Sequence, residues 1–349
     1  MRRRLIKERV AKTKKKQDVT PYQGDEINIE EALEIFVRAK EAEGVRPRTI
    51  HAYHNHIGYL IDYFTEIKGV QKPFLDDLTS DLIREYITYQ LTEKRRYEGE
   101  KGRKDKTVGL SPNTVNIRLR TLRTMCRFWY TEGLAAVNAM ENVKLVRTDE
   151  QPEVPGLSDK QVQTVINSMD EKHYAEWRDK ILILLLIDTG MRINEAVSLT
   201  LSDINFKDNM IVLSSERTKN RRYRDVPVSL DVIKLLLELN KESQEYFGST
   251  EQIFLNAYGE PFNSDSFRKR LNRLKSELGM ERLSPHMFRH TFARDYLLNG
   301  GDLFTLQKIL DHADIKTTRK YIQMSKDHLR SQHKNYTPAR KYLKRKPKM

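Results

Sequence analysis

The chain has 349 residues, of which 38% are hydrophobic, so it is long enough for two domains with sizeable cores. Lysine and arginine number 63 against 49 aspartate and glutamate, and the net charge of +14 favours nucleic acid over membrane as a partner. The longest apolar run, Ile181–Ile187, is far shorter than the roughly 20 residues of a membrane span. Cys126 is the only cysteine, which excludes a disulfide framework and a thiolate metal cluster. We expect it to be a small apolar residue on a helix.

Residues 1–26 are predicted to form a basic N-terminal arm. Residues 1–16 carry nine lysines or arginines against Glu8 alone, with no apolar stretch behind them. We therefore expect no secretory signal and a cytoplasmic protein. A solvated arm is the plain interpretation, and contact with DNA phosphates would order it.

Residues 27–147 are predicted to form a small helical bundle. Apolar residues recur at spacings of three and four, Gly69 is a stop signal, and Ser111 with Pro112 forms an N-cap and first turn. About four helices are expected, over Glu30–Glu43, from Ile50 to Phe64, over Ser80–Glu93, and from Ser111 to Trp129.

Two basic features of this bundle remain open at the level of sequence. Arg120, Arg123 and Arg127 share one face of the last helix, and this row is compatible with a solvated face and with a DNA-facing one. The segment Lys94–Gly109 contains seven lysines or arginines, three acids and three glycines, which predicts an exposed, mobile loop.

The stretch 148–156 is the predicted domain linker, because it has no periodicity, two prolines and a terminal glycine. A second domain is expected over 157–325, with helices around one short β region formed by Met210–Leu213 and Asp225–Val228. A basic tail, 326–349, follows it. The expected fold class is therefore mainly α with a small β-sheet (α+β).

Arg192 lies in a context that favours an anion site. The buried helix around Ile181–Ile187 is expected to break at Thr189 and Gly190, which places Arg192 on the first turn of the next helix. Helix N-termini attract anions, and a guanidinium adds a planar fork that matches two phosphate oxygens. Glu195 would hold Arg192 in place or cap the backbone.

A second polar cluster begins at Ser284 and Pro285, which are expected to start a helix. His286, Arg289 and His290 then share one face, as an anion-binding cluster would. The histidine spacing also resembles a metal-binding pair. With no carboxylate between the histidines and no third ligand nearby, metal is the weaker interpretation.

Two more elements complete the set. Lys219 lies at the tip of the predicted β-hairpin, close to Arg221 and Arg222, where a surface turn is the default explanation and reach into a cleft is the alternative. Further along, His312 is followed nine residues later by Tyr321.

In this order the residues resemble the tyrosine recombinases, the phage-type integrases that include Xer-like recombinases and related transposases. The resemblance covers residues 157–325, and the helical bundle fits the core-binding domain of that family. The family's catalytic positions correspond to Arg192, Lys219, His286, Arg289, His312 and, as the nucleophile, Tyr321.

The resemblance implies a defined chemistry. The tyrosine would attack a DNA phosphorus, form a 3′-phosphotyrosine and release a 5′-hydroxyl. Arg192 and Arg289, with a hydrogen bond from His312, would neutralise the non-bridging oxygens. Lys219 would be the general acid at the 5′-oxygen, and His286 would assist proton transfer at the phenol. Neither a cofactor, a divalent metal nor ATP is expected.

The resemblance also implies partners and a role. The expected partner is double-stranded DNA with inverted-repeat core sites, bound by a homotetramer on synapsed DNA that is largely monomeric when free, together with accessory recombination proteins and no membrane. Recombination for a mobile genetic element in a bacterium, at the nucleoid, is favoured. The alternatives are Xer-like dimer resolution, a non-catalytic site-specific DNA-binding protein, and a topoisomerase IB-like relaxase.

One position departs from the family pattern. Glycine most often precedes the later histidine in the family, and here that residue is Asp311. Aspartate tolerates a left-handed backbone but adds a negative charge beside the phosphate site. We expect Asp311 to turn outward or to pair with a neighbouring arginine, at a modest cost.

Overall fold

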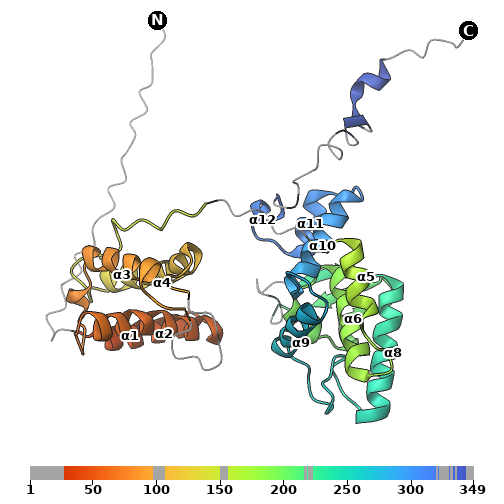
Figure 1. The fold of residues 1–349 in the computed structure, drawn as a ribbon, viewed down its shortest axis with the longest axis horizontal. Coiled ribbons are helices and arrows are strands. Elements are labelled where there is room, and N and C mark those ends of the chain that lie inside the picture. Colours follow the sequence, from red (N-terminus) through yellow and green to blue (C-terminus); the bar gives the residue numbers. More distant parts are fainter. Residues whose placement is uncertain are drawn as a thin grey trace, which may run out of the picture. The chain divides into compact units, whose positions relative to one another are not determined.

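The computed structural model describes residues 27–96, 107–149, 156–215, 218, 223–319, 321, 330, 333–334 and 336–342. The chain forms two compact units, Met1–Gln151 and Pro152–Met349 (Figure 1). The finer limits predicted for the arm, the two domains, the linker and the tail stay predictions. The basic arm of residues 1–26 lies outside the described residues.

The first unit is helical, and its predicted helices are confirmed. Helix α2 continues without a break as a π-helical turn, η1 (Tyr63–Ile67), and a 3₁₀ turn, η2 (Leu75–Asp77), comes before α3. The α-helices of its described residues are α1 (Ile29–Ala42), α2 (Pro47–Asp62), α3 (Ser80–Thr92) and α4 (Pro112–Thr131).

A core of buried apolar side chains holds this bundle together, and hydrogen bonds fix where its helices begin and meet. The side chain of Ser111 accepts from the backbone N–H of Thr114 at 3.2 Å, so α4 begins where the sequence predicts. Trp129 is 1% exposed, and its indole N–H donates to the carbonyl of Ala32 at 2.9 Å, which ties α4 to α1. Cys126 is buried on α4 as expected, and burial raises the pKa of its thiol to about 12.

The segment Lys94–Gly109 is paired at its base. Arg95 and Val108 form an isolated antiparallel bridge, and the expected exposed, mobile loop stays a prediction. Its central residues, 97–106, lie outside the described residues.

The second unit is mainly helical and contains one small three-stranded sheet, which confirms the predicted fold class. Its described elements are α5 (Asp159–Asn167), α6 (Tyr174–Thr189), α7 (Ile193–Val197), η3 (Leu201–Asp203), β1 (Ile204–Asn205), β2 (Met210–Leu213), β3 (Arg224–Pro227), α8 (Leu230–Phe247), α9 (Ser264–Glu277), α10 (Pro285–Leu298), α11 (Leu303–Leu310), α12 (Ile315–Arg319) and the 3₁₀ turn η5 (Pro338–Lys341).

The sheet is antiparallel, with the strand order β1-β2-β3 and Ile211 opposite Val226. Two details differ from the predicted hairpin. Strand β1 was not predicted, because two residues are too few to carry an alternating pattern. Strand β3 begins at Arg224, one residue earlier than expected, so this arginine belongs to the sheet and its side chain is buried.

Helix α6 packs against α10 and α8. It ends at the predicted break, Thr189 and Gly190, which lies in the interior of the unit. Gly190 caps α6 with a left-handed backbone, φ +62°. A Cβ at this position would lie 2.3 Å from the ring of Phe292 and 2.8 Å from the side chain of Leu310. Glycine is therefore required by both the turn and the close approach of α10 and α11.

Candidate active site

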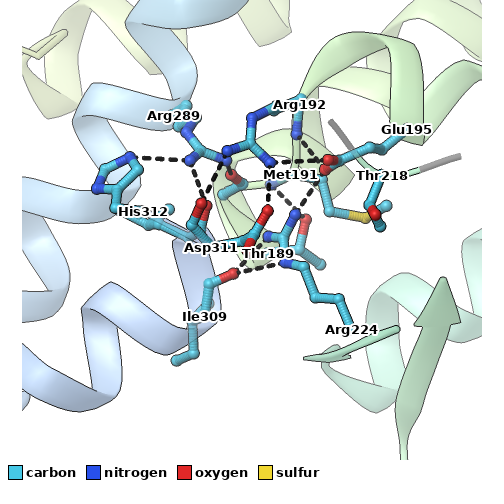
Figure 2. Close-up of polar contacts among 12 residues, drawn as sticks. Thr189, Met191, Arg192, Glu195, Thr218, Arg224, Arg289, Ile309, Asp311 and His312 are labelled. Carbon is cyan, nitrogen blue, oxygen red and sulfur yellow. Dashed lines mark hydrogen bonds and ion pairs between the residues drawn. The ribbon is translucent and has the colours of Figure 1, made fainter. Parts of the chain in front are cut away.

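Arg192 is the residue immediately before α7, so the prediction of a place on the first turn is off by one residue. Its backbone N–H donates to Glu195 Oε2 at 3.0 Å, and its Nη1 donates to Glu195 Oε1 at 2.9 Å (Figure 2). Glu195 therefore caps the backbone and also holds the guanidinium, as the two interpretations of this residue proposed.

Asp311 lies on the other side of the Arg192 guanidinium. Arg192 Nη1 is 3.2 Å from Asp311 Oδ2, and Nη2 donates to the Asp311 carbonyl at 3.0 Å. The aspartate has the left-handed backbone of the position that ends α11, with φ 52° and ψ 49°. The expectation that it tolerates this conformation and pairs with a neighbouring arginine is confirmed.

Arg224, on strand β3, also binds the carboxylate of Glu195. Its Nη1 donates to Glu195 Oε2 at 2.6 Å, and its Nε donates to the carbonyl of Ile309 at 3.0 Å. Burial is the main cause that lowers the pKa of this guanidinium. Because Glu195 is only 2% exposed and bridges two guanidiniums, it is the buried counter-charge of the cluster.

Arg289 extends from α10 and is 6% exposed. Its Nη1 donates to the carbonyl of Gly190 at 2.7 Å, and its Nη2 donates to that of Leu310 at 2.6 Å. Burial, together with the charges of Arg192 and Arg224, lowers the pKa of Arg289 to about 9. That value is still well above neutral pH, so the guanidinium stays charged.

The C-terminal end of α11 joins the three arginines. The carbonyls of the consecutive residues 309–311 each accept from a different one of Arg192, Arg224 and Arg289 (Figure 2). The last carbonyls of a helix have no intrahelical donor, and they form the negative end of its dipole. This helix end therefore fixes the directions of three guanidiniums that come from three different elements.

The charges of this cluster do not cancel. Three guanidiniums face the carboxylates of Glu195 and Asp311, which leaves one net positive charge. All three guanidiniums are largely removed from water. In such a partly buried site they attract an anion more strongly than they would at an exposed surface. The arrangement is thus suited to bind a single negative charge.

His312 completes the side of the cluster next to Arg289. Its Nε2 lies 3.0 Å from Arg289 Nη2, and its Nδ1 lies 2.9 Å from the hydroxyl of Thr318. A guanidinium only donates, so Nε2 accepts the hydrogen bond from Arg289. The ring proton is then on Nδ1, which donates to the hydroxyl oxygen of Thr318. Burial and then the charges of Arg289 and Arg192 lower the pKa of His312 to about 4, so the ring is neutral at neutral pH.

Tyr321 lies next to this histidine. The two rings are stacked, with centroids 6.4 Å apart, and the phenol is near enough to Arg289 to affect the pKa of that arginine. The hydroxyl of Tyr321 is 2.7 Å from Nδ1 of His290 on α10. The resemblance implies a role in proton transfer at this phenol for His286, an exposed residue one turn earlier on α10, and that role stays a prediction.

The remaining residue of the predicted set, Lys219, lies outside the described residues, as do Arg221 and Arg222. Thr218 is described and fully buried, and its backbone N–H donates to the carbonyl of Ser214 at 3.3 Å. It is drawn with the arginine cluster in Figure 2.

The predicted arginine row on α4 belongs to the first unit and is not uniform. Arg120 and Arg127 are exposed. Arg123 is half-buried, and its Nη2 donates to the carbonyl of Val143 at 2.7 Å. Its guanidinium therefore anchors the chain that follows α4.

Two further findings concern the part of the chain that the structure describes. No group of three or more His, Cys, Asp or Glu side chains in it is arranged to hold a metal ion. None of its helices combines the length and the apolar character that crossing a membrane requires.

The chain is similar to known DNA recombinases. Residues 156–328 match the phage integrase family. The chain is 26% identical to the tyrosine recombinase XerD of Halalkalibacterium halodurans over 309 residues, which are 88% of this chain and 97% of that protein. It is 29% identical to the tyrosine recombinase XerA of Saccharolobus solfataricus over 313 residues, 90% of this chain and 93% of that protein.

Two solved structures share the fold. The Tn1549 transposon integrase in complex with a circular intermediate DNA has a TM-score of 0.64 and 18% identity, covering 88% of this chain and 99% of that one. The XerH site-specific recombinase bound to difH substrate has a TM-score of 0.61 and 21% identity, covering 87% of this chain and 83% of that one.

The chain belongs to the tyrosine recombinases of the phage integrase family. It is a site-specific DNA recombinase.

Two residues of the site were not assigned to it from the sequence, although each left a signal. Arg224 is two residues before the buried Val226, and the alternation of a strand places both on the inner face. His290 was placed on the face of His286 and Arg289, but its contact with Tyr321 depends on a chain reversal of thirty residues that no local pattern encodes.

Proposed function

We propose that the chain recombines DNA through attack of Tyr321 on a phosphodiester that Arg192 and Arg289 bind. The observation that carries this proposal is the placement of a phenol beside a buried cluster of guanidiniums with one net positive charge. Main-chain carbonyls and Glu195 fix these guanidiniums, so little reorganisation is needed when a phosphate binds.

The charge of one phosphodiester matches the charge of the cluster. On binding, we expect a non-bridging oxygen to displace the Asp311 carboxylate from Nη1 of Arg192, while the Asp311 carbonyl continues to hold Nη2. The transition state carries more negative charge on these oxygens than the bound substrate does, so the same donors accelerate cleavage.

His312 would join these donors only after its Nε2 gains a proton. In the free protein its Nε2 accepts from Arg289. The positive charges around it contribute to its low pKa, and a bound phosphate opposes them. Binding of the phosphodiester therefore favours a proton on Nε2, which then donates to a phosphate oxygen.

The remaining steps form a covalent phosphotyrosine that retains the energy of the phosphodiester bond. Attack by Tyr321 forms a 3′-phosphotyrosine and breaks the bond to the 5′-oxygen, to which Lys219 would supply a proton. The covalent bond retains the energy of the phosphodiester, so a 5′-hydroxyl of another strand can reverse the step without ATP. Each proton transfer in this scheme is made by a side chain, and none needs a metal ion.

A nicked duplex oligonucleotide tests the proposal. A nick close to the cleaved bond lets the short 5′-hydroxyl fragment diffuse away, so the covalent complex accumulates in a denaturing gel. We expect the wild type to form it and Tyr321→Phe to form none. Tyr336→Phe, at a tyrosine that is 76% exposed, is the matched control and should retain the wild-type yield. A wild-type protein that binds the DNA without ever forming the complex would be a non-catalytic binder and would contradict the proposal.

For the biological role, we propose recombination of a mobile genetic element at the bacterial nucleoid, by a homotetramer on inverted-repeat sites with accessory proteins. The basic arm of residues 1–26 and the segment Lys94–Gly109 support this role, because both extend beyond a minimal Xer-like recombinase. Sequencing the DNA attached to Tyr321 in cells tests it. Ends of a mobile element are expected, and a chromosomal dimer-resolution site would favour the Xer-like alternative instead.

We also propose that residues 326–349 link subunits by packing on a neighbouring copy of the chain. Nine lysines or arginines in residues 322–349 also suit phosphate contacts, so the two roles must be separated. Deletion of 326–349 should impair cooperative binding to paired sites more than binding to one half-site, as measured by gel shift. Equal losses on both substrates would support phosphate contacts instead.

A further inference from the structure

The hydrogen bond between Tyr321 and His290 is not explained by the roles given above. Nδ1 of His290 lies 2.7 Å from the phenol oxygen, and the two rings are tilted by 50° with centroids 5.4 Å apart. His290 is half-buried on α10 and follows Arg289 directly. Successive residues on a helix point about 100° apart, so α10 directs Arg289 into the cluster and its neighbour toward the nucleophile.

The chemistry of the reaction requires a proton acceptor at this oxygen. A phenol ionises with a pKa of about 10, so at neutral pH it attacks phosphorus slowly unless its proton is removed. A general base must lie within about 2.6–3.2 Å of the proton donor, and the His290 nitrogen meets this geometric condition in the free protein.

His312, the other histidine that contacts Tyr321, is less suited to this task. Its Nδ1 proton is directed to Thr318, and its Nε2 accepts from Arg289, so both ring nitrogens already have partners. Burial and the charges of Arg289 and Arg192 lower its pKa to about 4, which makes it a weak base. Its position beside Arg289 fits contact with phosphate instead.

We propose that His290, in place of His286, is the catalytic residue that accepts the phenol proton of Tyr321 during attack, an inference that rests on the proposed function. In this step the Tyr321 oxygen forms its bond to phosphorus as its proton moves to Nδ1 of His290. The bond from phosphorus to the 5′-oxygen breaks, and that oxygen takes a proton from the general acid. In the reverse step the imidazolium returns the proton to the phenol, so His290 is regenerated in each cycle.

The first measurement is the rate of covalent complex formation on the nicked duplex by the full chain. His290→Ala should slow this rate by about 100-fold, the lower end of the usual contribution of a general base. DNA affinity and thermal stability should stay close to those of the wild type. His173→Ala, which removes an exposed histidine from the start of α6, is the matched control and should leave the rate unchanged. A His290→Ala rate within threefold of the wild type would overturn the inference, and so would a rate above it, since the contact would then restrain the nucleophile.

The second measurement separates proton transfer from simple positioning. Tyr321 is replaced by a difluorinated tyrosine, whose phenol ionises at lower pH and needs a base less. The defect of His290→Ala should then shrink to about tenfold or less, given the dependence of attack on the phenolate. An unchanged defect would mean that His290 only orients the ring, and the inference would fail.

A third measurement distinguishes the two ends of the reaction. A substrate with sulfur in place of the bridging 5′-oxygen has a leaving group that needs no proton. It should restore cleavage by Lys219→Ala and leave the His290→Ala defect in place, whereas restoration of both would contradict the assignment. If the wild type itself forms no complex through Tyr321, the proposed function fails. If only the His290 results fail, the proposed function stands without this inference.

Discussion

Two arginines on α4 of the first unit and two arginines of the cluster in the second unit differ in burial. On α4 of the first unit, Arg120 and Arg127 are exposed, and their long side chains end in solvent. In the second unit, Arg224 and Arg289 are each 6% exposed and are held by carbonyls from other elements. The side chains that share a positive charge in this sequence therefore differ in role: some end at an exposed helix face, and others are fixed inside the second unit by main-chain carbonyls.

Burial of charge is costly, and it is concentrated in one unit. Removing an ion from water costs several kcal/mol even after the protein relaxes. Among the described residues, every buried charged side chain lies in the second unit: Arg178, Asp179, Glu195, Arg224 and Arg289. A fold tolerates such a cost where the buried charge is paired and hydrogen-bonded.

Burial alone does not define the active site, as Arg178 demonstrates. It pairs with Asp179 at 2.7 Å, donates to the carbonyl of Leu255 at 2.8 Å and stacks on Phe262 at 3.6 Å. It lies on α6 about 18 Å along the helix axis from Gly190, at 1.5 Å per residue. Arg178 and Asp179 neutralise each other, whereas the cluster around Arg289 has one unbalanced positive charge.

The largest expected effect is on cleavage by Arg289→Lys. The ammonium keeps the charge but cannot hold the carbonyls of Gly190 and Leu310 while also donating to a phosphate oxygen. We expect covalent complex formation to fall by about 100- to 1,000-fold, the usual loss when one transition-state donor is removed. Arg178→Lys is the matched control, and it should lower stability with little change in the cleavage rate of the folded protein. Equal losses of cleavage would remove the distinction between the two buried arginines.

Glu195→Gln should produce the next largest effect, on stability. It removes the carboxylate shared by Arg192 and Arg224 and leaves both cations without it. Removing one partner of a buried ion pair lowers the free energy of unfolding by about 3–5 kcal/mol. We expect this loss to appear as faster hydrogen exchange across α7 and β3. Glu176→Gln, at a half-buried carboxylate that pairs with Arg270, should change exchange much less. A Glu195→Gln protein as protected as the wild type would show that the helix end alone supports the cluster.

How much of this site was predictable follows from the range of each interaction. Arg192, Arg289, His312 and Tyr321 were named from local context and from resemblance, and the structure brings these four together. The contacts made by the C-terminal carbonyls of α11 could not be predicted from the sequence. These carbonyls meet arginines that lie up to 119 residues away in the chain. Such contacts depend on tertiary packing, which periodicity does not report.

Asp311 tests the balance of charge within the cluster, and its expected effect is smaller. Asp311→Asn removes the charge but retains a side chain that tolerates the left-handed backbone, whereas Asp311→Gly also relaxes that backbone. Arg192 keeps Glu195 and the carbonyl of residue 311 in both variants. We expect each to raise cleavage by about threefold or less, because Arg192 keeps its other partners and a pair that is still partly exposed contributes about 1 kcal/mol or less. A sharp rise would mean that Asp311 holds the site inactive.

The smallest effects are expected for the arginines of α4. Arg127→Ala should weaken DNA binding about equally for all sequences and reduce the salt slope of the binding constant by about 1, as loss of one phosphate contact does. Arg123→Ala should leave that slope unchanged and cost about 1 kcal/mol of stability, because its guanidinium donates to the carbonyl of Val143. Titrations at several salt concentrations, with thermal unfolding of both variants, separate the two outcomes. If Arg123→Ala alone lowered the slope, the half-buried arginine would be the one that reaches DNA, and exposure on α4 would not identify the phosphate contacts.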